Sequence, residues 1–238
     1  MRPTIYFLGA GGAHDLTWGN SSALLLWEGQ KFLIDCGFTV YPKLVHEKLV
    51  EKIDAVCISH LHDDHIGSLS ALLYHRHYRS HLPPLHIIVG TSELYAKLHT
   101  ILHFLMGDVE KFARLTFPRE YSPHLDAIST HRLHAPHMPS CAYLFSSPKG
   151  HLIYTGDISV PLPLLEDAEW ISSHQPLWVF HDIAFKKNPF HCYYEDLYPY
   201  RERAHIWGYH CDANEAPENN LIPLVHTAFM QIPEALRE

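Results

Sequence analysis

The sequence has no long apolar run and little charge. No window reaches the roughly 18 consecutive apolar residues of a membrane-spanning helix, so we expect no membrane partner. Charged residues are only 18% of the 238 residues, and the formal net charge of −8 argues against a general electrostatic grip on nucleic acid. Apolar residues at 47% and aromatic residues at 12% suffice for a sizeable core, which excludes a disordered chain.

The sequence also lacks a CxxC pair. Its five cysteines are odd in number and widely spaced, which favours buried free thiols in a reducing compartment and predicts a cytoplasmic protein. Residues 1–15 contain one short, glycine-rich apolar run. This run predicts a buried strand and a turn, and it is too short for a signal peptide.

Short apolar runs alternate with turn signals along the chain, and longer segments show helical periodicity. The helical segments are residues 40–53, 66–78, 92–106 and 194–204. Many β-rich runs with few helices favour a layered α/β fold with two sheets over one parallel sheet. We interpret residues 1–238 as a single domain.

Histidine, by contrast, is abundant: 22 residues, against 18 for lysine and arginine together. Four potential ligands fall in the segment Ser59-His60-Leu61-His62-Asp63-Asp64-His65-Ile66-Gly67, on an expected strand-to-helix loop. His60 and His62 alternate and point the same way in an extended loop, whereas Asp64 and His65 can face a second position. Imidazole and carboxylate ligands suit zinc, iron or manganese, and two ions sharing the loop are more natural than one.

This HxHxDHxG segment resembles the signature of the metallo-β-lactamase superfamily. Other parts agree in order: residues 7–13 resemble the opening strand and glycine turn, and residues 154–157 resemble the strand ending in the aspartate that bridges both metals. The resemblance covers about residues 4 to 211. It implies an α/β fold, a four-layered αββα sandwich, with the metals at the edge between two sheets.

The resemblance also implies the remaining ligands. One histidine is expected about twenty residues before Asp157, where residues 137–143 fit the family pattern best and His134 is the alternative. The last ligand follows a late strand, and both His210 and His226 fit this position. The family-like order of the segment before His210 favours it over His226. The implied sites are His60, His62 and His137 for one ion, and Asp64, His65 and His210 for the other, with Asp157 shared. Two such cations lower the pKa of a shared water and make hydroxide available at neutral pH, and Asp64 can orient it.

Residues 180–185 and 190–197 resemble a stretch of ribonuclease Z and related phosphodiesterases. Carried over by position, Asp182 is an acid that supports His191, although this chain has Asp where the family has Glu. A protonated histidine held by a carboxylate can give its proton to a leaving alkoxide. The interval between His137 and Asp157 has no room for a basic RNA-binding arm, so a small or cyclic phosphodiester is expected as substrate and nucleic acid is less favoured.

These observations predict a metal-dependent hydrolase with two divalent ions, zinc favoured over manganese or iron, that acts on a small or cyclic phosphodiester. A lactonase or thioesterase of the same fold is the alternative enzyme, and it would not need the pair His191 and Asp182. A non-catalytic metal-binding or ligand-binding member is the third hypothesis, against which the intact ligand set argues. A homodimer is a general expectation for a chain of this kind.

Overall fold

The computed structural model describes residues 2–238 and contains two β-sheets. The first sheet has six strands in chain order: β1 (Thr4–Gly9), β2 (Ser22–Trp27), β3 (Gln30–Ile34), β4 (Ala55–Ile58), β5 (Leu85–Val89) and β6 (Ala113–Thr116). The second has the spatial order β11-β10-β9-β8-β7, with β7 (Leu125–Ser129), β8 (Cys141–Ser147), β9 (Gly150–Tyr154), β10 (Leu177–Asp182) and β11 (His205–Tyr209). Both sheets are mixed, with antiparallel pairs toward one end and parallel pairs β3-β4-β5-β6 and β9-β10-β11 toward the other.

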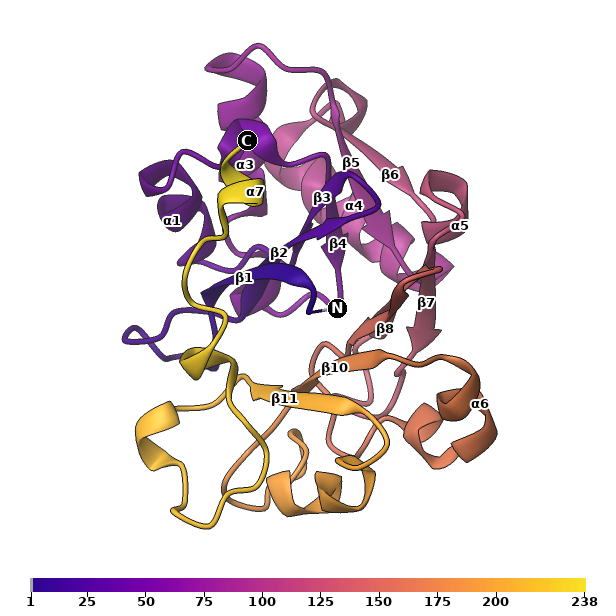
Figure 1. The fold of residues 1–238 in the computed structure, drawn as a ribbon. Coiled ribbons are helices and arrows are strands. Elements are labelled where there is room, and N and C mark those ends of the chain that lie inside the picture. Colours follow the sequence, from indigo (N-terminus) through magenta and orange to yellow (C-terminus); the bar gives the residue numbers. More distant parts are fainter. Residues whose placement is uncertain (1) are drawn as a thin grey trace.

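The helices lie outside the two sheets. They are α1 (Val40–His46), α2 (Asp63–Ile66), α3 (Leu69–Tyr78), α4 (Ser92–Met106), α5 (Pro118–Tyr121), α6 (Ala168–Ser173) and α7 (Glu234–Arg237). Figure 1 shows α1, α3 and α4 with the first sheet in its upper half and α6 with the second sheet in its lower half. The expected four-layered αββα sandwich is therefore confirmed. No helix of the described residues combines the length and hydropathy needed to span a bilayer.

Side chains that point alternately to the two faces of each strand build the core between the sheets. In β8, Tyr143 and Phe145 join the cluster that contains the first sheet, while Leu144 joins a second cluster under α6. Successive strand residues point to opposite faces, so one apolar strand serves both layers. Phe7 of β1 packs against Phe180 with ring centroids 5.4 Å apart, which joins the two sheets directly.

One predicted helix is different in the structure. Residues 194–204 were expected to be helical, but only Tyr194–Tyr200 is helical, and it is a 3₁₀ helix. Pro199 lies inside this segment and has no backbone N–H to donate, which disfavours a regular α-helix there. The interval 40–53 is likewise divided, into α1 and a 3₁₀ turn at Val50–Lys52.

Candidate metal centre and active-site pocket

The candidate site lies where strands of the two sheets end together. The loop after β4 carries His60 and His62, and α2 carries Asp64 and His65. Asp157 follows β9, and His210 follows β11. Side chains that follow the carboxyl ends of parallel strands meet at one edge of the fold, which is why Asp64 and His210, 146 positions apart, become neighbours.

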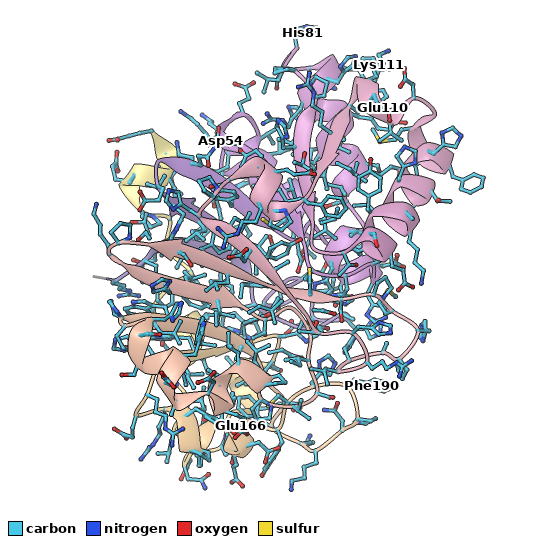
Figure 2. The ribbon with its side chains drawn as sticks, turned by 90° about the vertical axis from the view of Figure 1, so that its right-hand side faces the viewer. Asp54, His81, Glu110, Lys111, Glu166 and Phe190 are labelled. Atoms are coloured by element: carbon cyan, nitrogen blue, oxygen red, sulfur yellow. The ribbon has the colours of Figure 1, made fainter. Side chains whose placement is uncertain are left out.

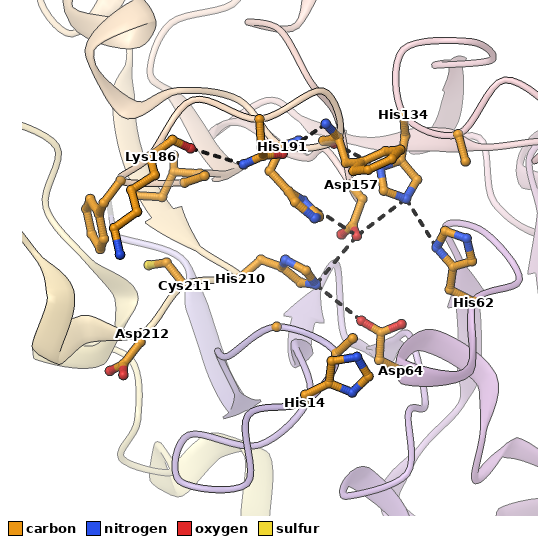
Figure 3. A pocket seen from close by; sticks show the side chains of 18 of the residues that line it. His14, His62, Asp64, His134, Asp157, Lys186, His191, His210, Cys211 and Asp212 are labelled. Atoms are coloured by element: carbon orange, nitrogen blue, oxygen red, sulfur yellow. Dashed lines mark hydrogen bonds and ion pairs between the residues drawn. The ribbon is translucent and has the colours of Figure 1, made fainter.

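Three groups of possible ligand atoms form at this edge, with all atoms of a group within 4.8 Å of one another. The first is His60, His62, His134 and Asp157, and the second is Asp64, His65, Asp157 and His210; these two are the ligand groups. The third consists of Asp157, Asp182, His191 and His210. Asp157 belongs to both ligand groups, in the sharing arrangement that the sequence predicted. Figure 3 shows Asp157 between His134 and His210, with Asp64 and His62 nearby.

The structure corrects one predicted ligand. His134, and not His137, lies in the first group: its Nε2 is 3.1 Å from Nδ1 of His62 and its side chain is buried. The N–H of Met138 bonds to the carbonyl of Ala135 in a turn. The His137 side chain after this carbonyl is exposed and lines the pocket, but it belongs to none of the three groups. Sequence alone placed both histidines within three residues of each other, and only the turn separates them.

The second alternative, His226, lies away from both groups. Its ring packs edge-on against Trp18 at 4.6 Å, and it belongs to a 3₁₀ turn at Val225–Thr227. His210 takes the position expected of the last ligand, with Nε2 3.3 Å from the carboxylate of Asp64 and 3.5 Å from that of Asp157. The geometry therefore agrees with the preference for His210.

The donor atoms of these residues fit divalent cations. Nδ1 of His62 faces Nε2 of His60 at 3.0 Å as well as Nε2 of His134, so three imidazole nitrogens converge on one point. Nε2 of His65 and Oδ1 of Asp157 are buried and have no hydrogen-bond partner among the described residues. Buried polar atoms without partners are rare, and a cation would satisfy them.

Electrostatics favour the same interpretation. Burial lowers the pKa of His60 well below its usual value and also lowers that of His62, so both rings are held neutral, as metal ligands must be. Burial raises the pKa of Asp157, but the nearby His210 and His65 outweigh it and hold the pKa well below its usual value. The first ligand group thus offers neutral nitrogens beside an ionised oxygen. In the second group burial lowers the pKa of His65 and of His210, but Asp157 and the other carboxylates nearby outweigh it and raise both. A bound cation would replace the protons of these two rings.

Residues behind the ligands fix their rings. Asp35 follows β3, is fully buried, and accepts hydrogen bonds from Nδ1 of His65 at 2.8 Å and from the backbone N–H of Ser59 at 2.7 Å. A carboxylate behind a ligating histidine fixes its tautomer and orientation. The sequence predicted no role for Asp35, and the signal that could have marked it is an acid directly after a buried apolar run.

Two backbone features make room for this arrangement. Asp35 and His210 are non-glycine residues with φ of 59° and 66°, in the left-handed region that costs energy for such residues. Gly156 has φ of 64°, and a Cβ there would lie 2.8 Å from Cβ of Ser59. A Cβ on Gly37 would lie 1.9 Å from the carbonyl oxygen of Asp64. Glycine at both positions therefore lets the ligand loops approach each other.

His191 and Asp182 form the contact expected from the sequence. Nδ1 of His191 donates to Oδ2 of Asp182 at 2.8 Å, so the shorter Asp side chain reaches the histidine. Burial lowers the pKa of His191, but the charge and hydrogen bond of Asp182 outweigh it and raise the pKa to about 9. Asp182 also accepts from the N–H of Ile158 and lies 3.6 Å from Nδ1 of His210, which links the pair to the centre.

The centre opens into a pocket of about 770 Å³, a size typical of small-molecule sites. The ligand wall includes His62, Asp64 and Asp157, and His191 faces the same space (Figure 3). Another part of the lining comes from the segment after β10. Its apolar residues are Ile183, Ala184, Phe185 and Phe190, and its polar residues are Lys186, Asn188 and His191.

Solved structures place this fold among the metallo-β-lactamase proteins. The metallo-β-lactamase fold protein YhfI from Bacillus subtilis superposes with a TM-score of 0.70 at 17% identity, covering 92% of this chain and 90% of that one. Human tRNase Z, short form, superposes with a TM-score of 0.66 at 18% identity, covering 91% of this chain and 97% of that one. The fold and site together define a metallo-β-lactamase-fold protein with a candidate two-metal centre.

The sequence identifies a more specific family within this fold. Residues 3–234 match the family described as Anti-Pycsar protein Apyc1, and the chain belongs to that family. A relative of that name from Paenibacillus harenae is 30% identical over 172 residues, which cover 68% of this chain and 70% of the relative. Another, from Paenibacillus sp. (strain J14), is 41% identical over 87 residues, and this alignment covers 36% of the chain and 35% of the relative. The predicted resemblance to metallo-β-lactamase superfamily hydrolases near ribonuclease Z is confirmed.

Proposed function

We propose that the chain is a phosphodiesterase that opens small cyclic phosphodiesters, with cyclic mononucleotides as the substrate class. The proposed enzyme uses two divalent metal ions, and zinc is favoured over manganese and iron. The observation that carries the proposal is the pair His191 and Asp182 beside the two ligand groups. Breaking a phosphodiester releases an alkoxide, which needs a proton, whereas a thioester releases a thiolate, which can leave without one.

In this proposal His60, His62 and His134 hold one ion, Asp64, His65 and His210 hold the other, and Asp157 is shared. Bound divalent ions would lower the pKa of water and stabilise charge on the phosphoryl oxygens. The carboxylate of Asp64 lies at the pocket wall, where it can accept a hydrogen bond from the attacking water and orient it.

In this proposal, residues of the chain position the proton that the leaving group takes. Nδ1 of His191 is engaged by Asp182, which leaves Nε2 as the donor toward a substrate. The water oxygen forms a bond to phosphorus and one of its protons leaves to solvent. The bond from phosphorus to the leaving ribose oxygen breaks, and that oxygen takes the proton from His191, which regains a proton from solvent. The product is a linear nucleoside monophosphate. Asp182 acts as a positioning residue because it touches His191 and not the reacting atoms.

The pocket supports a small substrate. Its volume of about 770 Å³ suits a single nucleotide. The formal net charge of −8 makes a long polyanion an unfavourable partner, while cations at the centre would still attract one phosphate.

The test is a substrate comparison with metal-loaded protein. We expect hydrolysis of bis-p-nitrophenyl phosphate and of 3′,5′-cyclic nucleotides, and none of a lactone or a thioester above an Asp157→Ala control. Absence of phosphodiester cleavage above that control contradicts the proposal. Preferred cleavage of the lactone or thioester would identify the alternative enzyme, and two bound metals without any hydrolysis would identify a binding protein.

A second readout concerns the metals themselves. Chelation followed by reloading with zinc, manganese or iron should restore two ions per chain and raise the melting temperature, because a ligand that binds only the folded state stabilises it. Wild-type protein should bind both ions, and Asp157→Ala should lose affinity for both because this carboxylate belongs to both groups. One ion per wild-type chain would refute the two-metal assignment.

A further inference from the structure

One aromatic side chain at the pocket mouth has no place in the core. Phe190 lines the pocket with 49% of its side chain exposed, and it belongs to neither apolar cluster. Phe185, on the same segment, packs edge-on against Tyr194 at 5.5 Å and is part of a cluster. The aromatic contact of Phe190 within the described residues is with His134, at 6.2 Å between ring centroids.

The backbone that carries this ring is fixed. The N–H groups of Phe190 and His191 both donate to Oδ1 of Asn188 at 2.9 Å. The carbonyl of Phe190 accepts from Nδ1 of His134, also at 2.9 Å. A fixed backbone limits the positions that the ring can take, so less entropy is lost when a flat ligand covers it. Figure 2 shows Phe190 at the margin of the molecule, on the loop that follows β10.

The ring also lies at the right place for a substrate. The centroid of the Phe190 ring is 6.2 Å from that of His134, and the His134 centroid is 5.4 Å from that of His191. The His134 ring therefore lies between Phe190 and the proposed proton donor. A leaving ribose oxygen at His191 would put the attached base on this side of the pocket. Ile183 and Ala184 provide apolar surface elsewhere in the same pocket. Lys186 on the same loop is directed to Glu215, with Nζ 3.5 Å from its carboxylate.

We propose that Phe190 is the stacking platform for the nucleobase of a cyclic mononucleotide, and so forms a base subsite next to the metal centre. This inference rests on the proposed phosphodiesterase function. Aromatic stacking accepts every base because each has a flat π-face, so the subsite favours nucleotides over base-free phosphodiesters without selecting one base.

The experiment compares KM for cyclic nucleotides and for a base-free 1-deoxyribose 3′,5′-cyclic phosphate. Phe190→Ala should raise KM for cyclic pyrimidine and purine nucleotides about 5- to 100-fold, the loss expected for one stacked base. Its kinetics on the base-free substrate should match wild type. Phe190→Trp should restore a low KM, and Phe190→Leu, which lacks a flat face, should not. Phe104→Ala is the matched control, because Phe104 is 83% exposed on α4 and does not line the pocket.

Several results would overturn the subsite. An unchanged KM in Phe190→Ala would do so, and so would an equal fall of kcat on both substrate types, since that pattern would show an effect through His134. Metal content measured on each variant verifies that the centre is intact. If wild type hydrolyses no phosphodiester, the proposed function fails separately, and calorimetric binding of a cyclic nucleotide then decides the subsite. Weaker binding by Phe190→Ala supports the platform, and equal binding or none refutes it.

Discussion

Removal of the His191 side chain should slow hydrolysis in a way that depends on the leaving group. A cyclic nucleotide releases a ribose alkoxide, which needs a proton, whereas p-nitrophenolate leaves unprotonated at neutral pH. The ring of His191 is fixed by its 2.8 Å bond to Asp182 and is 26% exposed, so it presents one nitrogen in one direction. General acids held in this way contribute about 10²- to 10⁴-fold in rate, or roughly 3 to 5 kcal/mol of barrier.

We therefore expect His191→Ala to reduce kcat on a cyclic nucleotide by about 10²- to 10⁴-fold and on bis-p-nitrophenyl phosphate by about tenfold or less. Steady-state kinetics on both substrates, with bound metal measured in parallel, are the assay. Equal losses on the two substrates, with metal retained, would refute the role of proton donor. Asp182→Asn is the companion variant. It should show the same leaving-group dependence and additionally weaken metal binding, because Asp182 also lies 3.6 Å from Nδ1 of His210.

Three other predictions concern the ligands and the backbone around them. His134→Ala should lose most activity and one metal ion while His137→Ala stays near wild type, as kinetics and metal analysis can verify; the reverse result would restore the sequence-based choice. Asp35→Asn should weaken metal affinity about 10- to 100-fold in a chelator competition, because it removes the carboxylate behind His65, and unchanged affinity would contradict this. Gly156→Ala should lower the free energy of unfolding by more than about 1 kcal/mol in denaturant titration, owing to its φ of 64° and the contact with Ser59; wild-type stability would disprove the strain argument.

The limits of sequence-based prediction are visible in the strands. The sequence has an apolar run in each of the strands β1 to β5 and β8 to β11, but it has none in β6 or β7. Each lies at an edge of its sheet, and Ala113–Thr116 and Leu125–Ser129 are only partly buried. An edge strand needs fewer apolar residues and often carries charge, so its periodicity is weak. The edge strands β1 and β11 do carry apolar runs because most of their residues are buried, so burial and not position in the sheet decides which strands the sequence reveals.

The same reasoning applies to the site. The cluster from His60 to His65 could be predicted because its four ligands lie within six residues of the chain. The strand before this segment and the helix after it also define the geometry of the loop. His134 could not be separated from His137, because the turn that buries one and exposes the other is set by contacts with distant segments. His134 donates to the carbonyl of Phe190, a contact across 56 positions that no local pattern records.

Three histidines of the centre share one hydrogen-bonding arrangement, which explains why the number of histidines alone was a poor predictor of the ligands. Nδ1 of His65 donates to Asp35, and Nδ1 of His134 donates to a carbonyl. Nδ1 of His60 lies 3.0 Å from Oγ of Ser59, whose hydroxyl proton is directed to Asp35, so the imidazole is the donor there too. In each case Nε2 is left facing the centre. His181, equally buried, uses both nitrogens within the fold, since Nδ1 donates to the carbonyl of Asp182 and Nε2 accepts from the N–H of Leu162. A buried histidine in this chain is therefore a candidate ligand only when the protein engages one ring nitrogen and leaves the other free, which is a property of contacts and not of composition.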